Sequence, residues 1–181
     1  MDLIEVKGMK YGVRIVELED LEQLEKLEAE SYPADEAATP QKLELRAKQA
    51  SDLFLVAFDP MQNENPIVAY ACATLAAGEL TEESMAAHDP QGDNVCIHSV
   101  VVQKQLRRNG LGSAVLEAFI RHVEKVHSTS QKFRNLKRFS LLAKKHLCTF
   151  YIKCGFELIG PSPVEHGAEQ WFELQRVIQS N

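Results

Sequence analysis

The chain of 181 residues lacks the features that mark secreted, membrane-spanning and disulfide-stabilised proteins. Its first ten residues, MDLIEVKGMK, carry acids where a signal peptide has bases, and no run of about 18 apolar residues occurs anywhere. The four cysteines include no Cys-x-x-Cys pair, so we expect neither a disulfide framework nor a bound metal. These absences predict a protein of a reducing compartment, the cytoplasm first, with no membrane partner.

Basic residues are in the minority, with 20 Lys and Arg against 26 Asp and Glu and a formal net charge of −6. General electrostatic binding to nucleic acid is therefore not expected. The charge is unevenly distributed, because residues 17–36 hold nine acids and one lysine, whereas residues 104–153 hold twelve bases and two acids. The basic segment suits an anionic ligand, and a solvated basic face is the alternative. An RNA-binding surface is a weaker interpretation, because several aromatic residues in this segment belong to apolar faces.

Internal repeats and long Pro- or Gly-rich linkers are also missing, so we expect a single domain over residues 1–181. Apolar runs alternate with helical patterns along the chain, which predicts a mixed α/β (α+β) fold with a sheet of six or seven strands and about four helices. The expected strands are residues 11–18, 53–58, 67–75, 95–102, 138–143, 156–159 and 169–174. The expected helices begin near residue 20, ending before Pro33, and cover residues 40–49, 110–125 and 144–154.

The most informative segment is an apolar strand followed by a basic turn with two glycines and then a helix. The turn reads Arg107-Arg-Asn-Gly-Leu-Gly-Ser113. Backbone N–H groups at a helix start and the positive end of the helix dipole hold an anion, and glycine lets the backbone approach it closely. Lys104 and the two arginines add positive charge. The segment predicts a phosphate-binding loop, with a βα turn of no function as the alternative.

A second motif, Phe150-Tyr-Ile-Lys-Cys-Gly-Phe156, lies further along the chain. Together with Arg-x-x-Gly-x-Gly after an apolar strand, it resembles the GCN5-related N-acetyltransferase (GNAT) superfamily. The glycine motif resembles the acetyl-CoA pyrophosphate loop of that superfamily, and the tyrosine motif resembles its signature in which a helix brings a tyrosine to the CoA sulfur. The block LTEESMAAHDP at residues 80–90 narrows the likeness to the arylalkylamine (serotonin) N-acetyltransferase family and its fungal relatives. The resemblance covers roughly residues 50–175 and implies a GNAT fold with acetyl-CoA as cosubstrate and no metal.

By this resemblance, acetyl-CoA contacts two consecutive segments. Strand backbone at residues 100–102 is expected to hydrogen-bond the pantetheine arm in the gap between splayed strands, while the side chain of Val101 packs in the core. The pyrophosphate is expected on the loop and the helix start. The cosubstrate-binding residues are then Val100, Val101, Val102, Arg107, Arg108, Asn109, Gly110, Leu111, Gly112 and Ser113.

Acetyl transfer to an amine requires a base, because a primary alkylamine has a pKa of about 10 and arrives protonated at pH 7. His98 is the candidate, directly or through a water chain, since it matches the family's strand histidine and has an ordinary pKa of about 6.5. The alternative is a structural histidine bonded to backbone. The tetrahedral oxyanion needs a donor, most simply a strand N–H near Val100.

The departing thiolate needs a proton or a hydrogen bond, and Tyr151 matches the family's tyrosine at that position. An amphipathic core tyrosine is the alternative. The vertebrate enzymes carry a second histidine two residues before the one matching His98, where this chain has Cys96. A double-histidine relay is therefore not assumed, and Cys96 is either a small buried hydrophobe or a weak relay member.

The amine pocket is the least specified part of the sequence. Leu142 and Trp171 match positions that line the family's indole pocket, although a core or surface-covering role fits equally well. An acidic segment around Glu28, Glu30 and residues 32–36 could instead attract a cationic polyamine, with a solvated acidic helix as the alternative. A catalytically silent acyl-CoA sensor is the rival from another class, disfavoured by the presence of His98 and Tyr151. The vertebrate enzymes of this family are controlled through phosphorylated tails that recruit 14-3-3 proteins. The end of this chain lacks the basic context of such a phosphorylation site, so no 14-3-3 partner is expected.

Overall fold

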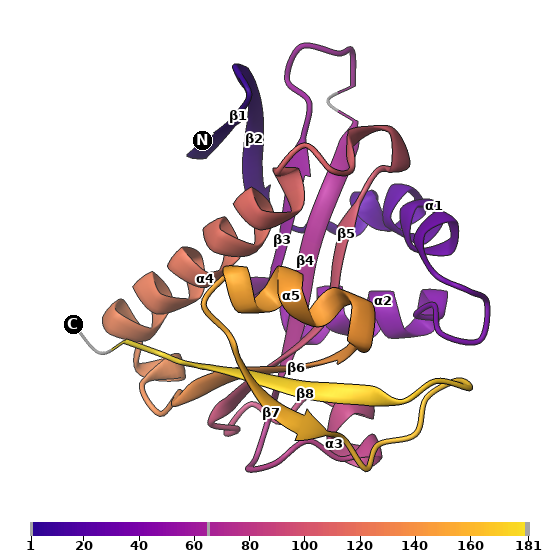
Figure 1. The fold of residues 1–181 in the computed structure, drawn as a ribbon. Helices are drawn as coiled ribbons and strands as arrows, with labels where there is room; N and C mark the ends of the chain where they lie inside the picture. The colour runs from indigo at the N-terminus through magenta and orange to yellow at the C-terminus, as the bar shows by residue number, and fades with distance from the viewer. Residues whose placement is uncertain (1, 65, 180–181) are drawn as a thin grey trace. The chain divides into compact units, whose positions relative to one another are not determined.

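The computed structural model describes residues 2–64 and 66–179 of the chain. These residues form eight strands and five α-helices, with the strands in the order β1-β2-β3-β4-β5-β6-β8-β7 (Figure 1). The mixed α/β class is confirmed, whereas the expected six or seven strands and about four helices are each too few. The strands are Asp2–Val6 (β1), Met9–Ile15 (β2), Phe54–Phe58 (β3), Ile67–Ala76 (β4), Asn94–Val102 (β5), Arg138–Lys144 (β6), Glu157–Pro161 (β7) and Trp171–Val177 (β8). The α-helices are Leu21–Ser31 (α1), Pro40–Gln49 (α2), Glu82–Ala86 (α3), Leu111–Thr129 (α4) and Lys145–Lys153 (α5).

The additional strand is β1, which the sequence pattern did not reveal. It pairs antiparallel with β2 through the two-residue turn Lys7-Gly8, where both residues have positive φ, +49° and +83°. Such turns match the twist of paired strands and normally use Asn-Gly or Asp-Gly, so Lys-Gly gave no clear hairpin signal. Only Ile4 of β1 is buried, which removes the alternation that would mark a strand.

The chain divides into two compact units, and the boundaries between them fall within β4, β5 and α4. The first unit runs up to Cys72 and also includes Ser99–Phe119; the second comprises Ala73–His98 and the residues from Ile120 onward. The expectation of a single domain stays a prediction.

In the first unit, α1 and α2 contribute to a core cluster together with β3 and β4. Helix α1 buries Leu24 and Leu27, α2 buries Leu43 and Ala47, and the clustered strand side chains include Tyr70. The helical spacing of the leucines in α1 explains why the sequence predicted this element correctly. Helix α2 begins at Pro40 behind an N-capping Thr39, whose side chain accepts the N–H of Lys42.

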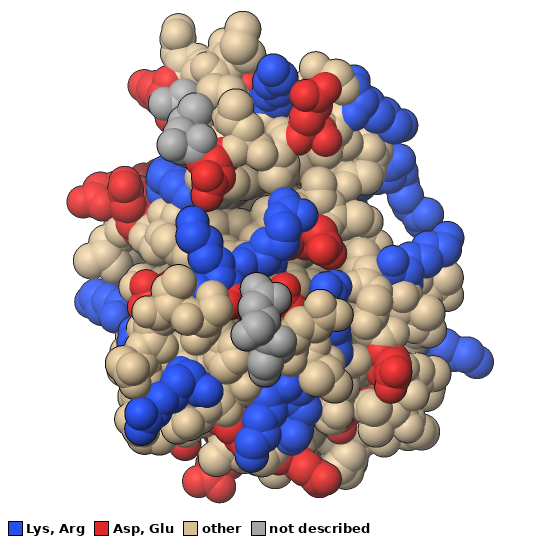
Figure 2. Space-filling view, turned by 90° about the vertical axis from the view of Figure 1, so that its left-hand side faces the viewer, with Lys and Arg blue, Asp and Glu red and all other residues tan. Residues whose placement is uncertain are grey.

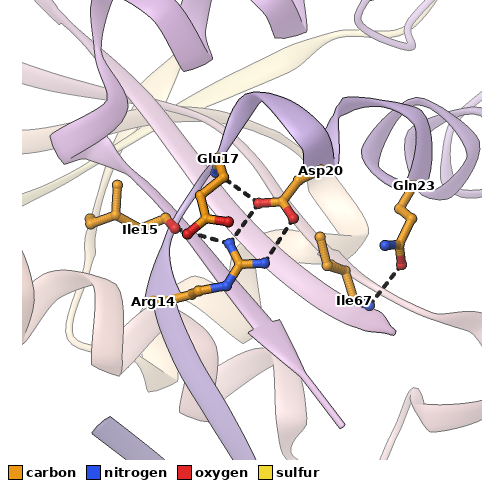
Figure 3. A network of polar contacts seen from close by, with 6 residues as sticks. All are labelled: Arg14, Ile15, Glu17, Asp20, Gln23 and Ile67. Carbon is orange, nitrogen blue, oxygen red and sulfur yellow. Dashed lines mark hydrogen bonds and ion pairs between the residues drawn. The ribbon is translucent and has the colours of Figure 1, made fainter. Parts of the chain in front are cut away.

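A polar network ties β2 to the start of α1 (Figure 3). The guanidinium of Arg14 makes two parallel hydrogen bonds of 2.7 and 2.8 Å to the carboxylate of Asp20, which also accepts the N–H of Glu17. Gln23, one turn further on, accepts the N–H of Ile67 at the beginning of β4. Because Asp20 is buried and the pairing is bidentate, this contact fixes where the chain turns from strand to helix.

In the second unit, β6 pairs antiparallel with β8, and β8 with β7, while β5 runs parallel to β6 over Asn94–Ile97. Helix α5 contacts all three strands β6, β7 and β8. Four free cysteines are found, three buried and one half-buried, and no described helix is long and apolar enough to cross a membrane. On the face shown in Figure 2, Lys and Arg alternate with acidic and neutral side chains and do not merge into one basic patch.

Candidate active site

The turn between β5 and α4, in the first unit, has the backbone conformation of an anion-binding loop. Arg108 and Gly110 both lie in the left-handed region, with φ of +61° and +93°. The N–H of Ala114 makes the first helical bond, 3.0 Å, to the carbonyl of Gly110. The preceding amides of Leu111, Gly112 and Ser113 have no acceptor within the helix by its geometry, so they can donate to a phosphate. The residues of the loop therefore fit the diphosphate of a CoA thioester.

Arg107 takes a different place from the one expected of a phosphate ligand. Its Nε donates to the carbonyl of Val102 at 2.9 Å, and its terminal nitrogen donates to Ser31 Oγ at 3.0 Å. The guanidinium thus joins the end of β5 to the last residue of α1. Two of the five N–H donors of Arg107 thus bond within the protein and brace the loop. The exposed side chain of Arg108, beside it, is the better candidate for contact with a phosphate.

The strand leading into this loop buries alternate side chains. Val101 is 2% exposed and belongs to the core cluster of the first unit, whereas Val100 and Val102 are half-buried. Just beyond the strand, the N–H of Gln103 donates to the carbonyl of Val68 at 2.8 Å. The side chain of Val101 has the expected packing role. Binding of pantetheine by this backbone remains a prediction.

In the second unit, both ring nitrogens of His98 have polar neighbours. Nε2 lies 2.7 Å from Thr74 Oγ1, and Nδ1 lies 3.9 Å from Cys96 Sγ. Thr74 and Cys96 are buried, while the imidazole is half-buried. The hydroxyl can donate to the ring nitrogen and accept from a third group at the same time, which makes it a proton-conducting neighbour. Thr74 is a functional candidate that the sequence did not reveal, because nothing in an apolar strand marks one threonine.

The motif Tyr-x-x-x-Gly-Phe forms the end of α5. Gly155 adopts φ of +85°, its N–H bonds to the carbonyl of Ile152, and the N–H of Phe156 returns to the carbonyl of Tyr151. These are the two bonds of a Schellman ending, whose usual apolar contact is here the edge-on packing of Phe156 on Tyr151, 5.9 Å between centroids. The motif therefore fixes both the end of the helix and the position of the Tyr151 ring.

Tyr151 is a half-buried side chain whose hydroxyl makes no hydrogen bond with the described part of the chain. Burial, followed by the neighbouring Cys154 and Cys148, raises the pKa of its phenol well above the ordinary 10. The hydroxyl therefore keeps its proton at neutral pH. A proton held this tightly makes the group a better hydrogen-bond donor to a thiolate than a source of a transferred proton, which refines the acid role expected from the sequence.

The two expected pocket residues lie close together on the second unit. Leu142 pairs with Glu173, and Trp171 is two residues before Glu173, so Leu142 and Trp171 are diagonal neighbours on one sheet face. Leu142 packs against the cluster of Ala76, Leu80 and Cys96, as Met85 of α3 does. The LTEESM block thus contributes to the surroundings of Leu142, a role that its sequence alone did not indicate.

Trp171 carries a cationic neighbour. The Lys144 ammonium lies 5.8 Å from the indole centroid and 3.4 Å from Glu169, and the indole N–H donates to the carbonyl of His166. The lysine side chain is largely buried, at 12% exposed. A positive charge held against the ring disfavours a second, mobile cation at this place.

The hypothesis that Glu28 attracts a cationic amine from the surface is wrong. Glu28 is 2% exposed, accepts the N–H of Ala38 at 2.8 Å and accepts the hydroxyl of Tyr70. Burial, followed by the adjacent Glu28 carboxylate, raises the pKa of Tyr70 well above its usual value. The carboxylate fastens the 32–39 segment to β4, and Glu30 remains exposed. Helical spacing placed Glu28 with the other acids and could not reveal its buried partners.

Among the other histidines, His88 and His127 each bring a ring nitrogen to a backbone group. His88 accepts the N–H of Leu75 through Nδ1 at 3.1 Å, and burial, together with the nearby Lys132 charge, lowers its pKa. His127 Nδ1 lies 2.7 Å from the carbonyl of Phe133. No group of three or more His, Cys, Asp or Glu with metal-binding geometry occurs in the described ranges 2–64 and 66–179.

Comparison with solved structures defines the fold class. The loading GNATL domain of CurA from Lyngbya majuscula superposes with a TM-score of 0.76 at 13% identity, covering 93% of this chain and 98% of that one. A GNAT-like decarboxylase, GphF in complex with isobutyryl-CoA, gives 0.73 at 16% identity, covering 93% and 100%. The ribosomal-protein-S18-alanine N-acetyltransferase of Escherichia coli gives 0.64 at 17%, covering 94% and 96%. The fold is that of the GNAT proteins.

Sequence comparison identifies the family. Residues 18–156 match the acetyltransferase (GNAT) family, and the chain therefore belongs to it. The serotonin N-acetyltransferase of Mesocricetus auratus is 31% identical over 113 residues, which cover 62% of this chain and 51% of the relative. That of Macaca mulatta is 25% identical over 119 residues, covering 65% and 55%. The chain thus spans about half the length of the curated relatives it matches.

Proposed function

We propose that this protein is an acetyl-CoA-dependent N-acetyltransferase that transfers acetyl to the primary amine of a small arylalkylamine of the tryptamine, serotonin or phenylethylamine type. The observation that carries the proposal is the 2.7 Å contact between His98 Nε2 and Thr74 Oγ1. A module that only binds acyl-CoA needs the loop before α4, but it does not need a half-buried histidine with a hydroxyl on its ring nitrogen. The similarity to serotonin N-acetyltransferases supports the same class of reaction.

In the proposed deprotonation, the proton of the amine passes through the Thr74 hydroxyl to His98. The Thr74 hydroxyl donates to an unprotonated Nε2 and, through its oxygen, accepts a proton from the amine or from one intervening water. Protonated His98 then holds the charge while the neutral amine attacks the thioester carbonyl. Cys96 touches the other ring nitrogen only at the long sulfur distance of 3.9 Å, which suits a weak orienting contact.

The remaining groups act on the developing charges. We assign the oxyanion to a backbone N–H near Val100 and the departing thiolate to the Tyr151 hydroxyl, which stays protonated because burial raises its pKa. Strand backbone at positions 100–102 and the amides at the start of α4, residues 111–113, hold the acyl donor, and Arg107 braces the loop before that helix. Holding both reactants together contributes further through proximity.

The surroundings of Trp171 favour an aromatic over a polycationic acceptor. Lys144 already places a positive charge against the indole, and Glu28, one of the acids expected to attract a polyamine, is occupied by Tyr70 and Ala38. A polyamine would therefore be repelled by Lys144 beside Trp171, and the Glu28 carboxylate is not available to bind it. None of the four cysteines forms a disulfide within the described part of the chain, which favours a reducing compartment, and we propose a cytoplasmic location.

The test is thiol release from acetyl-CoA by the purified protein with tryptamine, phenylethylamine, spermidine, a lysine peptide or no amine. We expect amine-dependent release that is fastest with the two arylalkylamines. Spermidine as the best substrate would replace the proposed acceptor by a polyamine. Tight CoA binding without release for any amine would overturn the enzyme proposal in favour of the sensor.

A further inference from the structure

The short helix α3 lies in the segment between β4 and β5, and that segment is pinned at both ends by contacts within the second unit. At its beginning, the carbonyl of Gly78 accepts Asn94 Nδ2 at 2.9 Å and a terminal nitrogen of Arg138 at 2.8 Å, and its N–H donates to Asp93. Three side chains therefore hold the two backbone groups of one residue. This clamp fixes where the chain leaves β4.

The far end of the segment is held against β4 itself. The N–H of Leu75 donates to His88 Nδ1, and the N–H of Asp89 donates to the carbonyl of Leu75 at 2.9 Å. At Gly92 a Cβ would meet the backbone of Ala76 at 2.6 Å, so the two backbones are in direct contact. Between these ends, α3 starts with a reciprocal capping box of Thr81 and Ser84. The position of α3 is thus fixed by contacts at both ends of the segment.

Met85 is the residue of α3 that packs against the same cluster as Leu142, one of the two residues expected to line the amine pocket. Met85 and Leu142 are both half-buried, and both pack against the same cluster of Ala76, Leu80 and Cys96. Cys96 Sγ in turn lies 3.9 Å from His98 Nδ1. The cluster against which these two half-buried side chains pack therefore includes the cysteine that neighbours the proposed base.

We infer that Met85 determines acceptor specificity: together with Leu142 it forms the apolar surface on which the aromatic ring of the amine lies. A thioether is flexible and polarizable and makes favourable contacts with aromatic rings, which suits a surface that receives a flat ring. Glu82 and Glu83, on the same helix, are exposed and do not share this packing. The inference rests on the proposed function and adds the residue that selects for the ring.

The experiment compares kcat/KM for tryptamine with kcat/KM for n-butylamine in the wild type, Met85→Ala, Met85→Leu and the control Met61→Ala, a methionine that is 88% exposed. We expect Met85→Ala to lower the tryptamine-to-butylamine ratio about tenfold or more, mainly through the KM for tryptamine. Met85→Leu should restore most of the ratio, and Met61→Ala should leave it unchanged. The dissociation constant of CoA, measured by calorimetry, should be the same in all four proteins.

The outcomes separate the inference from the function beneath it. Equal losses for tryptamine and butylamine in Met85→Ala, or an unchanged ratio, would overturn the role of Met85 while leaving the acetyltransferase intact. A CoA affinity that falls with Met85→Ala would assign the residue to the structure of the fold and would also overturn the role. A wild type that binds CoA but acetylates no amine would overturn the proposed function and the inference together.

Discussion

The two compact units carry sites of different construction. In the first, the anion-binding loop is contiguous in sequence and uses backbone amides and left-handed residues, Arg108 and Gly110. In the second, His98 of β5 meets Thr74 of β4, and Met85 and Leu142 pack against one cluster from a helix and from a different strand. The proposed binding of a phosphate thus depends on local chain geometry, whereas the proposed proton transfer and ring selection depend on side chains brought together by folding. Variants in the two units should separate binding from chemistry.

The largest effect is expected for His98→Ala. Removal of the base should lower kcat/KM with tryptamine about 10²- to 10³-fold near pH 7 and leave the CoA dissociation constant within about twofold of the wild type. Steady-state kinetics and calorimetry measure the two quantities. His127→Gln is the matched control, because Nδ1 of that histidine lies against the backbone carbonyl of Phe133 near the end of α4 and has no role in the proposed chemistry. A rate reduced less than about fivefold by His98→Ala would remove the histidine from the reaction.

Gly110→Asp should produce the reverse pattern. A side chain at φ of +93° strains the loop, and its carboxylate repels the diphosphate, so we expect CoA to bind about 30-fold more weakly. Gly110→Ala, which carries the strain without the charge, should lie between the variant and the wild type. An unaltered CoA dissociation constant in Gly110→Asp would show that the anion binds elsewhere.

Tyr151→Phe should reduce turnover about tenfold while the CoA affinity is preserved. Phenylalanine keeps the edge-on contact with Phe156 and removes only the hydroxyl that we assign to the thiolate. The measurement is single-turnover acetylation, so that product release does not conceal the chemical step. Full single-turnover activity in this variant would contradict the assignment.

Thr74→Val should reduce turnover about fivefold or more, and Thr74→Ser should restore it. Valine keeps the shape of threonine and removes the Oγ1 that lies 2.7 Å from His98, whereas serine keeps the hydroxyl. The pH dependence of kcat/KM distinguishes a relay from a packing role, because loss of the hydroxyl should displace the acidic limb. Equal activity of the valine and serine variants would remove the hydroxyl from the proton path.

The smallest effect is the pH dependence of stability due to Tyr151. Its pKa is raised in the folded state, so its contribution is complete below about pH 10 and is lost as the pH rises from there towards the folded pKa. Between pH 9 and 11 the free energy of unfolding should therefore fall about 1 kcal/mol further in the wild type than in Tyr151→Phe. Urea denaturation at several pH values measures the difference. Parallel curves would place the phenol in water.

Prediction from sequence succeeded where a pattern is local. The leucine spacing predicted α1, and Pro40 marked the start of α2. The glycine-containing turn and the apolar pattern after β5 predicted α4, and Gly155 marked the end of α5. It failed at β1, where Lys-Gly replaces the usual turn residues and one side chain is buried. It also failed for Glu28. Periodicity places this residue on a helix face, but it does not reveal that a hydroxyl from β4 and an amide from the 32–39 segment both bond to the Glu28 carboxylate.

The sequence by itself determined the family, the loop with its glycines and the identities of His98 and Tyr151, because these reside in short motifs whose geometry is set by neighbouring residues. The tertiary structure decided which partners those groups have. The Thr74 hydroxyl reaches His98 from a different strand, Met85 reaches the cluster beside Leu142 from a separate helix, and Arg107 is committed to Val102 and Ser31. Contacts between residues distant in the chain exist only after the strands pair, and for this reason no local pattern encodes them.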